Sequence, residues 1–484
     1  MRQPTVGLVV CPVVIPSRGA SRDLLPQKVA LAFGAFLEEI LRARCALGMT
    51  PIPTPTLPSM PIHIAGLSRL CLLLALPCAT LAQARPERAQ DMRIMLDGVP
   101  GSNDAITDVP GVLVGHTTLI RGNGLLEEGK GPVRTGVTAI VPAGRDSLRP
   151  LFAGWFSLNG NGEMTGTAWI EEYGYLLYPI LITNTNSVGV ARDAVIEWGQ
   201  PLVGPNAWTC CLPVVAETWD GDLNDIFGYH VEKQHVFAAI NSARGGPVQE
   251  GNVGGGTGMI CLGFKGGIGT ASRHLPDRQG GYTVGVLVQC NFGLRNQLRI
   301  SGIPVARDMT VPPECYDTQG PLDSTLARYR CSRDIGLAGD GDPRSAIGDG
   351  PVGPGGREGS IIVIIATDAP LLPHQLKRIA KRASLGIGRM GGIAGSGSGD
   401  IFLAFSTARL PPADSTNLLT LRAVDDNRIN PLYEATVQAT EEAIINAMLA
   451  AETMTGANYY KVPALPHDQL RAVLAKYGRL RPDR

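Results

Sequence analysis

A serine stands at the junction between a glycine-rich segment and a strongly apolar one. Gly355-Gly-Arg-Glu-Gly-Ser360 runs directly into Ile361-Ile-Val-Ile-Ile-Ala-Thr367. Five consecutive Ile and Val residues predict a strand that is covered on both faces. The glycine before the serine allows backbone conformations that other residues avoid. Ser360 is therefore a candidate nucleophile on a rigid element; the alternative is a strand that begins with serine after an ordinary turn.

A serine hydroxyl is a weak nucleophile that needs a base, and the sequence shows none beside Ser360. No Gly-x-Ser-x-Gly motif and no Ser/His/Asp set surrounds this serine. The histidines at positions 116, 230, 235 and 274 lie in no recognisable motif. We interpret these histidines as structural.

Other polar side chains follow predicted strands and are candidates for the same site. Glu217-Thr-Trp-Asp-Gly221 follows the apolar segment 212–216, and Asn291 follows the apolar segment 281–290. A side-chain amide at the end of a central strand can serve as an oxyanion donor, although an asparagine here also suits a turn. The glycine-rich segment 251–259 lacks the Lys-Ser/Thr of a P-loop, so it predicts tight backbone packing rather than nucleotide binding.

The elements that must position these residues alternate along the chain. Strands are predicted over 106–119 (two, broken at Pro110-Gly111), 136–141, 178–183, 212–216, 237–240, 281–290, 361–367 and 401–405. Helices are predicted from 188 to Gly199 with Ser187 as the cap, over 372–382, and as a long amphipathic segment over 430–455. Strands interspersed with helices in this order favour an α/β or α+β fold with stacked layers.

Composition narrows the class of protein. The 484 residues suffice for two to four domains or for one large unit, and 44% of them are hydrophobic. The 43 basic residues balance the 43 acidic ones, so bulk charge does not indicate a nucleic-acid partner. No apolar run reaches the ~18 residues of a membrane-spanning helix.

The first hundred residues differ from the remainder. Residues 60–84 have the layout of a secretory signal peptide, with an apolar run over 70–82 and Ala82-Gln-Ala84 as a small-x-small cleavage site. Residues 1–59 would then be a mis-assigned or disordered extension, since a signal works from the N-terminus. This interpretation predicts a periplasmic or secreted protein, with no membrane association after signal removal.

The ten cysteines fit an exported chain. Cys315 and Cys331 lie in a polar segment, where an oxidising compartment would allow a disulfide. The others are expected either before the cleavage site or as buried small hydrophobes: Cys11, Cys45, Cys71 and Cys78 in the first group, Cys210, Cys211, Cys261 and Cys290 in the second. No C-x-x-C or His-rich spacing occurs, so we expect no metal and no cofactor.

Five separated motifs resemble those of one family. They are Val215-Ala-Glu-Thr-Trp-Asp220, Gly254-Gly-Gly-Thr-Gly-Met259, Val288-Gln-Cys-Asn-Phe-Gly293, Ala366-Thr-Asp-Ala-Pro-Leu-Leu-Pro-His-Gln-Leu376 and Gly397-Ser-Gly-Asp400. Together they resemble the DmpA-type aminopeptidases, which include L-aminopeptidase/D-amidase-esterases and β-peptidyl aminopeptidases. The resemblance covers about residues 103–455.

This resemblance implies an α+β fold, a four-layer αββα sandwich similar to the N-terminal-nucleophile hydrolases. It also implies a precursor that cleaves itself between Gly359 and Ser360. The products would be an α chain, 103–359, and a β chain, 360–484, assembled as a homo-oligomer. Residues 308–358 are longer than this connection needs, and we interpret them as a surface excursion.

The resemblance assigns roles to four residues around the cleavage point. Ser360 is expected to be the nucleophile, Asn291 the oxyanion donor, and Ser398 and Asp400 the pair beside the nucleophile, where some relatives have Glu at the last position. Cleavage would supply the missing base, because the new α-amine of Ser360 has an unperturbed pKa of ~7.7–8.0.

Two further residues concern the substrate. Glu217 is similar to the acid that receives the free amine of the substrate, and Trp219 falls where some relatives have Tyr. The leading hypothesis is a self-processing serine aminopeptidase that removes small N-terminal residues (L-, D- or β-aminoacyl) from peptides, amides or esters. The alternatives are an acyltransferase like the ornithine acetyltransferases, which use Thr rather than Ser, and a non-catalytic secreted binding protein. Substrate stereochemistry and subunit number are left open.

Overall fold

The computed structural model describes residues 86–146, 148–202, 212–322, 327, 329–331 and 359–482. These residues lie within one compact unit, Ala84–Arg484. Several sequence predictions fall outside the described residues. They are the extension 1–59, the signal peptide 60–84, Cys210, Cys211, and residues 332–358 of the excursion predicted over 308–358.

Two β-sheets form the middle of the molecule. The first has the order β1-β2-β5-β6, with β1 (Leu113–Arg121), β2 (Val133–Val141), β5 (Ile180–Asn184) and β6 (Val215–Thr218). The second has the order β4-β3-β13-β12-β10-β9, with β4 (Tyr175–Leu176), β3 (Leu151–Ser157), β13 (Asp400–Ser406), β12 (Ile361–Thr367), β10 (Thr283–Cys290) and β9 (Gly267–His274). β12 and β13 run parallel at the centre of this sheet.

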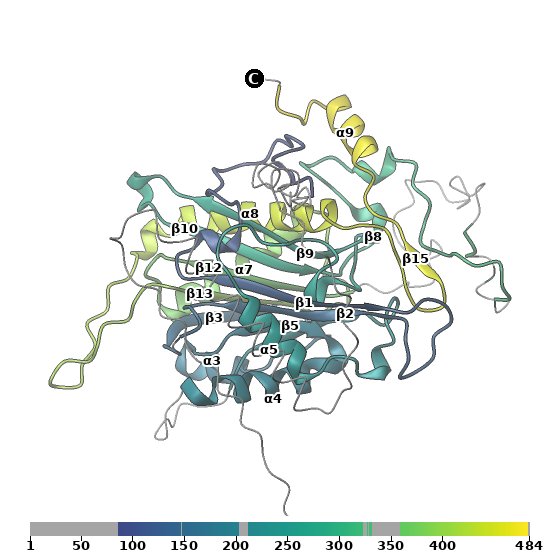
Figure 1. Cartoon of the computed structure of the whole chain (residues 1–484). Helices are drawn as coiled ribbons and strands as arrows, with labels where there is room; N and C mark the ends of the chain where they lie inside the picture. The colour runs from purple at the N-terminus through teal and green to yellow at the C-terminus, as the bar shows by residue number, and fades with distance from the viewer. Residues whose placement is uncertain are drawn as a thin grey trace, which may run out of the picture. The chain divides into compact units, whose positions relative to one another are not determined.

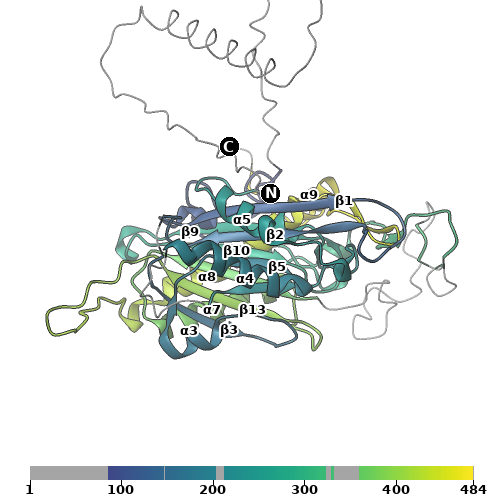
Figure 2. The same cartoon turned by 60° about the horizontal axis from the view of Figure 1, so that its bottom comes forward.

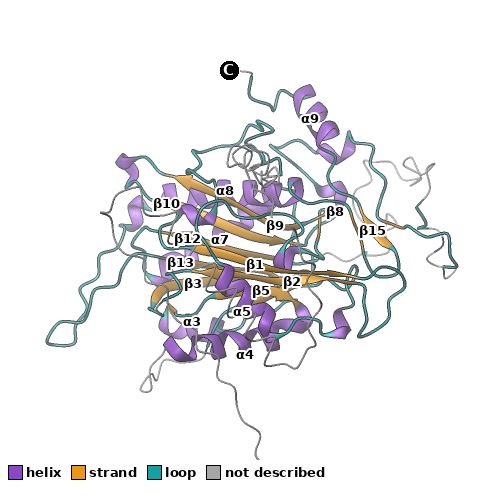
Figure 3. Ribbon diagram, in the orientation of Figure 1, coloured by secondary structure: helices purple, strands orange, loops and turns teal. Residues whose placement is uncertain are grey.

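Helices cover the outer face of each sheet (Figures 1 and 3). α4 (Val188–Gly199) and α5 (Lys233–Ser242) pack on the first sheet, and Figure 2 brings these two helices forward. α7 (Pro373–Arg389) and α8 (Asn430–Leu449) pack on the second sheet. The layers are therefore α, β, β and α, which confirms the predicted four-layer α+β sandwich.

β12 shows how the apolar sequence builds this arrangement. Successive strand residues point to opposite faces of a sheet. Ile362 and Ile364 enter the core between the two sheets, while Ile361, Val363 and Ile365 enter the core beneath α7 and α8. The run of Ile and Val is thus covered on both faces, as predicted.

Shorter elements complete the described chain. They are α3 (Thr167–Tyr173), β7 (Ile260–Cys261), β8 (Phe264–Lys265), β11 (Cys315–Tyr316), β14 (Met454–Thr455), β15 (Tyr460–Val462) and α9 (His467–Lys476). β11, β15 and β14 form a small third sheet. Cys315 of β11 is bonded to Cys331, which confirms the predicted disulfide.

Three predicted elements differ from the structure. Only β1 forms within 106–119, because Ile106–Asp108 makes a 3₁₀ turn before Pro110-Gly111. The strand predicted over 237–240 is part of α5, which buries Val236, Ala239 and Ile240 at helical spacing. The last long helix ends at Leu449 and is buried on almost every side rather than amphipathic, because α7, the second sheet and the segment around Ala89 all pack against it.

Two local predictions were also wrong. Ser187 precedes α4, but its side chain makes no capping hydrogen bond. Cys261 and Cys290 are fully buried as expected, yet they are bonded to each other, with Cα atoms 5.5 Å apart. β7 and the end of β10 bring them together across 29 residues of sequence, and this pairing cannot be read from local pattern.

Candidate active site

Ser360 lies buried at the start of β12, next to the segment that leads into β13. The Gly399 N–H donates to Ser360 Oγ over 3.0 Å, and the Ser398 hydroxyl contacts the Gly359 carbonyl oxygen at 2.6 Å. The parallel register places Ile361 opposite Asp400. The pairing of the two central strands therefore brings Ser398 and Asp400 beside the candidate nucleophile, as predicted.

Ser398 and Asp400 form a short polar chain. Ser398 Oγ lies 2.5 Å from Asp400 Oδ1, and the Ile361 N–H donates to the same oxygen over 3.3 Å. A hydroxyl has one proton, so Ser398 can donate to both Gly359 and Asp400 only in turn. If Asp400 is protonated, it can donate to Ser398 Oγ while the Ser398 hydroxyl donates to the Gly359 carbonyl, so both contacts are then hydrogen bonds. The pair can thus carry a proton to or from the Gly359–Ser360 bond.

Asn291 comes to this bond from β10. Its Oδ1 accepts from the Ile260 N–H over 2.7 Å, and its Nδ2 donates to the Trp219 carbonyl over 3.0 Å. A Cβ at Gly359 would lie 2.0 Å from the Asn291 carbonyl oxygen and 2.9 Å from Nδ2, so only glycine allows this close approach. An amide nitrogen carries two hydrogens, and Trp219 takes one of them. The geometry suits an amide that donates to an oxyanion at position 359.

Glu217 closes the site from the first sheet, at β6. It is buried, and it accepts from the Glu163 N–H at 2.9 Å and from the Thr185 hydroxyl. A Cβ at Gly162 would lie 3.2 Å from both Glu217 Oε1 and the Cα of Gly399. Gly162 therefore lies between Glu217 and Gly399, the residue whose N–H donates to Ser360 Oγ. Burial raises the pKa of this carboxyl.

Trp219 enters the site through its backbone. Its carbonyl oxygen is the acceptor for Asn291, while its ring packs edge-on against Phe227 with centroids 6.5 Å apart. The structure thus brings together all six residues that the sequence predicted for the site: Ser360, Asn291, Ser398, Asp400, Glu217 and Trp219.

Sequence reasoning missed the asparagines that hold the loop before β13. Asn159 Oδ1 accepts from the Asp400 N–H at 2.7 Å, and its Nδ2 donates to the Gly395 carbonyl at 3.0 Å. Asn161 donates to the Gly397 carbonyl at 2.7 Å. The Asn-Gly-Asn-Gly sequence after β3 is typical of a turn, and the adjacency of β3 and β13 that gives these asparagines their role is not visible in the sequence.

Neither a metal site nor a membrane span is found in the part of the chain that the structure describes. No group of three or more His, Cys, Asp or Glu side chains is placed to hold a metal ion there. Nor is any helix in those ranges long and apolar enough to cross a membrane.

The fold and the site together define a class. A buried serine opens a central strand of a four-layer αββα sandwich, with an amide donor and a Ser/Asp pair around it. This is a hydrolase of the N-terminal-nucleophile type. The chain belongs to peptidase family S58, whose model matches residues 104–462.

Individual relatives agree with this family. The chain is 51% identical over 405 residues to the β-peptidyl aminopeptidase BapA of Sphingosinicella microcystinivorans, covering 83% of this chain and 95% of that protein. It is 44% identical over 418 residues to the enzyme of the same name from Sphingosinicella xenopeptidilytica, covering 86% and 97%.

A solved structure shows the same fold. The L-aminopeptidase D-Ala-esterase/amidase of Ochrobactrum anthropi, a prototype of the serine aminopeptidases with a variant of the Ntn hydrolase fold, matches with a TM-score of 0.67 and 44% identity. The match covers 81% of this chain and 99% of that one. The protein is accordingly a serine aminopeptidase, and neither the acyltransferase nor the binding-protein alternative is favoured.

Proposed function

We propose that this chain is a precursor that cuts its own Gly359–Ser360 bond and then removes small N-terminal residues from peptides, amides or esters. One observation carries the proposal: the segment 398–400 contacts both Ser360 Oγ and the Gly359 carbonyl, while Asn291 lies against the same bond. The attacking oxygen, the carbonyl under attack and the donor for the oxyanion are therefore held in one place.

Self-cleavage would begin with attack of Ser360 Oγ on the Gly359 carbonyl carbon. The carbonyl oxygen becomes an oxyanion beside the donors on Ser398 and Asn291, and the hydroxyl proton passes to the amide nitrogen as the C–N bond breaks. The product is an ester between Gly359 and Ser360 Oγ. Water hydrolyses this ester, which leaves a carboxylate on Gly359 and a free amine on Ser360.

That amine then acts as the general base of the mature enzyme. The amine takes the proton of the Ser360 hydroxyl, either directly or through the Ser398–Asp400 pair. Ser360 Oγ then forms an acyl-enzyme with the substrate. The buried carboxylate of Glu217 would pair with the ammonium of the substrate. This pairing restricts cleavage to the first residue, since an internal residue offers no ammonium.

The expected substrates follow from the relatives. Both Sphingosinicella proteins are named for β-peptides and the Ochrobactrum protein for L- and D-residues. We propose β-aminoacyl substrates as the first to test, with L- and D-aminoacyl amides and esters beside them.

We further propose export to the periplasm or medium after cleavage behind Ala84, and assembly of the αβ units into a homo-oligomer. The structure supports the cleavage position. Arg88, four residues beyond Ala84, is already buried, with its Nε 2.7 Å from Glu250 Oε2. Residues directly after the expected cleavage site are thus part of the folded core.

Mass spectrometry of the purified protein tests self-processing. Wild type should give two chains with a new N-terminus at Ser360, and Ser360→Ala should stay continuous. Ser384→Ala, which removes a half-buried serine on α7, is the matched control and should process normally. An uncut wild type that is indistinguishable from Ser360→Ala would overturn the proposal. Release of p-nitroaniline from β-alanyl, L-alanyl and D-alanyl p-nitroanilides then ranks the substrates.

A further inference from the structure

Lys265 is a fully buried lysine at the end of β8. Its Nζ donates to the carbonyl oxygens of Met259 and Gly266, each at 2.8 Å, and lies 3.4 Å from that of Gly256. No ion pair with a carboxylate is found for Lys265 among the described residues. Burial without such a partner lowers the pKa of this ammonium to about 7.

This burial is costly and therefore informative. An ammonium removed from water without a carboxylate loses several kcal/mol of hydration. An apolar side chain of similar length, such as Met, would fill the same volume without that loss. Carbonyl dipoles alone compensate the charge, and all three belong to the glycine-rich loop and the turn beside it.

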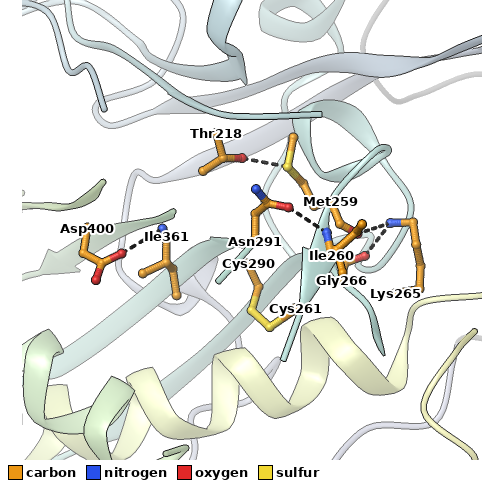
Figure 4. Close-up of a disulfide and its surroundings, with 10 residues drawn as sticks. All are labelled: Thr218, Met259, Ile260, Cys261, Lys265, Gly266, Cys290, Asn291, Ile361 and Asp400. Atoms are coloured by element: carbon orange, nitrogen blue, oxygen red, sulfur yellow. Dashed lines mark hydrogen bonds between the residues drawn. A yellow bond between two sulfur atoms is a disulfide. The ribbon is translucent and has the colours of Figure 1, made fainter. Parts of the chain in front are cut away.

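The Met259 carbonyl connects Lys265 to the candidate oxyanion donor (Figure 4). The Met259 carbonyl and the Ile260 N–H are the two ends of one peptide unit. That N–H donates to Asn291 Oδ1 at 2.7 Å, and Oδ1 and Nδ2 are the two ends of the side-chain amide. A chain of two amides thus runs from the ammonium to the nitrogen that faces position 359.

We propose that Lys265 is a positioning residue that fixes and polarises the Asn291 amide through the Met259–Ile260 peptide. The proposal rests on the oxyanion role of Asn291 given above. A hydrogen bond accepted at the oxygen of an amide makes its N–H a stronger donor, and bonds in series reinforce one another in a medium of low dielectric. A charged donor at the start of the series has the largest effect.

The surroundings of this peptide hold it even without the lysine. The Gly266 N–H also donates to the Met259 carbonyl, at 2.9 Å, and the Thr218 hydroxyl contacts Met259 Sδ at 2.7 Å. The disulfide between Cys261 and Cys290 links the next residue of the loop to the strand that carries Asn291. Loss of the charge can therefore be separated from loss of the structure.

Three variants separate the charge of Lys265, its hydrogen bond and its link to Asn291. Lys265→Met removes the donor and the charge, Lys265→Gln keeps an N–H donor without the charge, and Asn291→Ala removes the receiver. Arg273→Met is the matched control, because Arg273 is a buried cation on β9 that pairs with the opposite end of β10. The measurements are kcat and KM of the mature enzyme on an aminoacyl p-nitroanilide, and the half-time of self-cleavage.

We expect both Lys265 variants to lower kcat about 10-fold, the rate equivalent of losing one hydrogen bond to a charged group. KM should change little, and Arg273→Met should leave kcat unchanged. In an Asn291→Ala background the Lys265 substitutions should have no further effect, because the group they act through is gone.

Several outcomes overturn the inference. It fails if Lys265→Gln retains full kcat, if the Lys265 variants raise KM alone, or if their effect is the same with and without Asn291. If Lys265→Met does not fold, the kcat of Lys265→Gln with and without Asn291 decides the question. If a variant matures too slowly for kcat to be measured, the half-time of self-cleavage is compared instead. If Asn291→Ala itself leaves kcat intact, the oxyanion role in the proposed function fails instead.

Discussion

Buried cations lie beside both ends of β10, but the groups that they contact differ. At the Val284 end, Arg273 Nη2 lies 2.7 Å from Glu442 Oε2. Nearer the middle of the strand, beside Thr270, Arg88 Nε lies 2.7 Å from Glu250 Oε2. At the Cys290 end, Lys265 contacts only backbone carbonyls within the described residues. One end pairs its cations with carboxylates, whereas the other holds an ammonium against backbone carbonyls that lead to the reaction centre.

The paired end has one acid more than it has bases. Asp104 joins Glu250 and Glu442 against the two guanidinium groups. Burial, and the nearby Glu442, raise the pKa of Asp104 to about 7. The cluster therefore retains a proton near neutral pH and approaches zero net charge, as expected for a structural network. The comparison teaches that a buried charge does not by itself indicate a functional role. The role depends on which groups the charged side chain contacts.

The largest expected effect breaks the paired end. Arg273→Met leaves Glu442 buried without its guanidinium, so we expect a loss of about 3–5 kcal/mol in the free energy of unfolding. Urea titration should be done in the Ser360→Ala background, which keeps the chain continuous. The turnover of the folded mature variant should equal that of wild type. A lowered kcat in the folded fraction would contradict the division between the two ends.

The next largest effect is expected at the Cys290 end of β10, where Asn291 lies. Asn291→Ala should lower kcat by about 10²–10³-fold, because one oxyanion donor is lost. Self-cleavage should slow as well, and a gel time course measures it. The midpoint of thermal unfolding should move far less than in Arg273→Met. Equal losses of stability in the two variants would show that Asn291 is a packing residue.

A smaller effect concerns Glu217 across the site. Glu217→Gln should raise KM for substrates with a free amine about 10-fold, since a charged hydrogen-bonding partner is lost. Because burial raises the pKa of Glu217, kcat/KM of wild type should fall as the pH falls through that raised value. The variant should lack this limb of the profile. Glu163→Gln keeps the backbone N–H to Glu217 but removes a nearby charge that also raises the pKa of Glu217, so this control should keep the KM of wild type and move the limb to lower pH.

A last effect is a pair of opposite slopes in the dependence of stability on pH. Asp104 binds its proton more tightly in the folded state, so its contribution is lost as the pH rises from 3.8 to about 7. Lys265 binds its proton less tightly when folded, so stability rises from about pH 7 toward 10.5. Asp104→Asn should flatten the first slope and Lys265→Met the second. Slopes that survive both substitutions would assign the linkage to other groups.

Much of this site could be predicted because its residues follow strands with clear apolar patterns. The Ile/Val run fixed Ser360 at a strand start, and the apolar segment before Asn291 placed that amide at a strand end. The family motifs then joined positions that no local pattern relates. The helix from 188 to Gly199 was equally clear from its spacing.

The remaining features depend on contacts between distant segments. Phe237–Ile240 was misread because Val, Phe, Ala and Ile suit either a strand or a helix, and only packing on the first sheet decides. The pairing of Cys261 with Cys290, the roles of Asn159 and Asn161, and the chain from Lys265 to Asn291 all require the tertiary fold. None of them leaves a periodic signal in the sequence.

The strand order of the second sheet has a consequence for the lifetime of the enzyme. β12 and β13 occupy its centre, with β3 and β4 on one side and β10 and β9 on the other. If the chain is cut before Ser360 as proposed, the later fragment is held between two parts of the earlier one, so dilution would not separate them. Complete unfolding would, however, release two molecules that must meet again to refold. The mature enzyme would then resist inactivation through the height of its unfolding barrier, while recovery would depend on concentration.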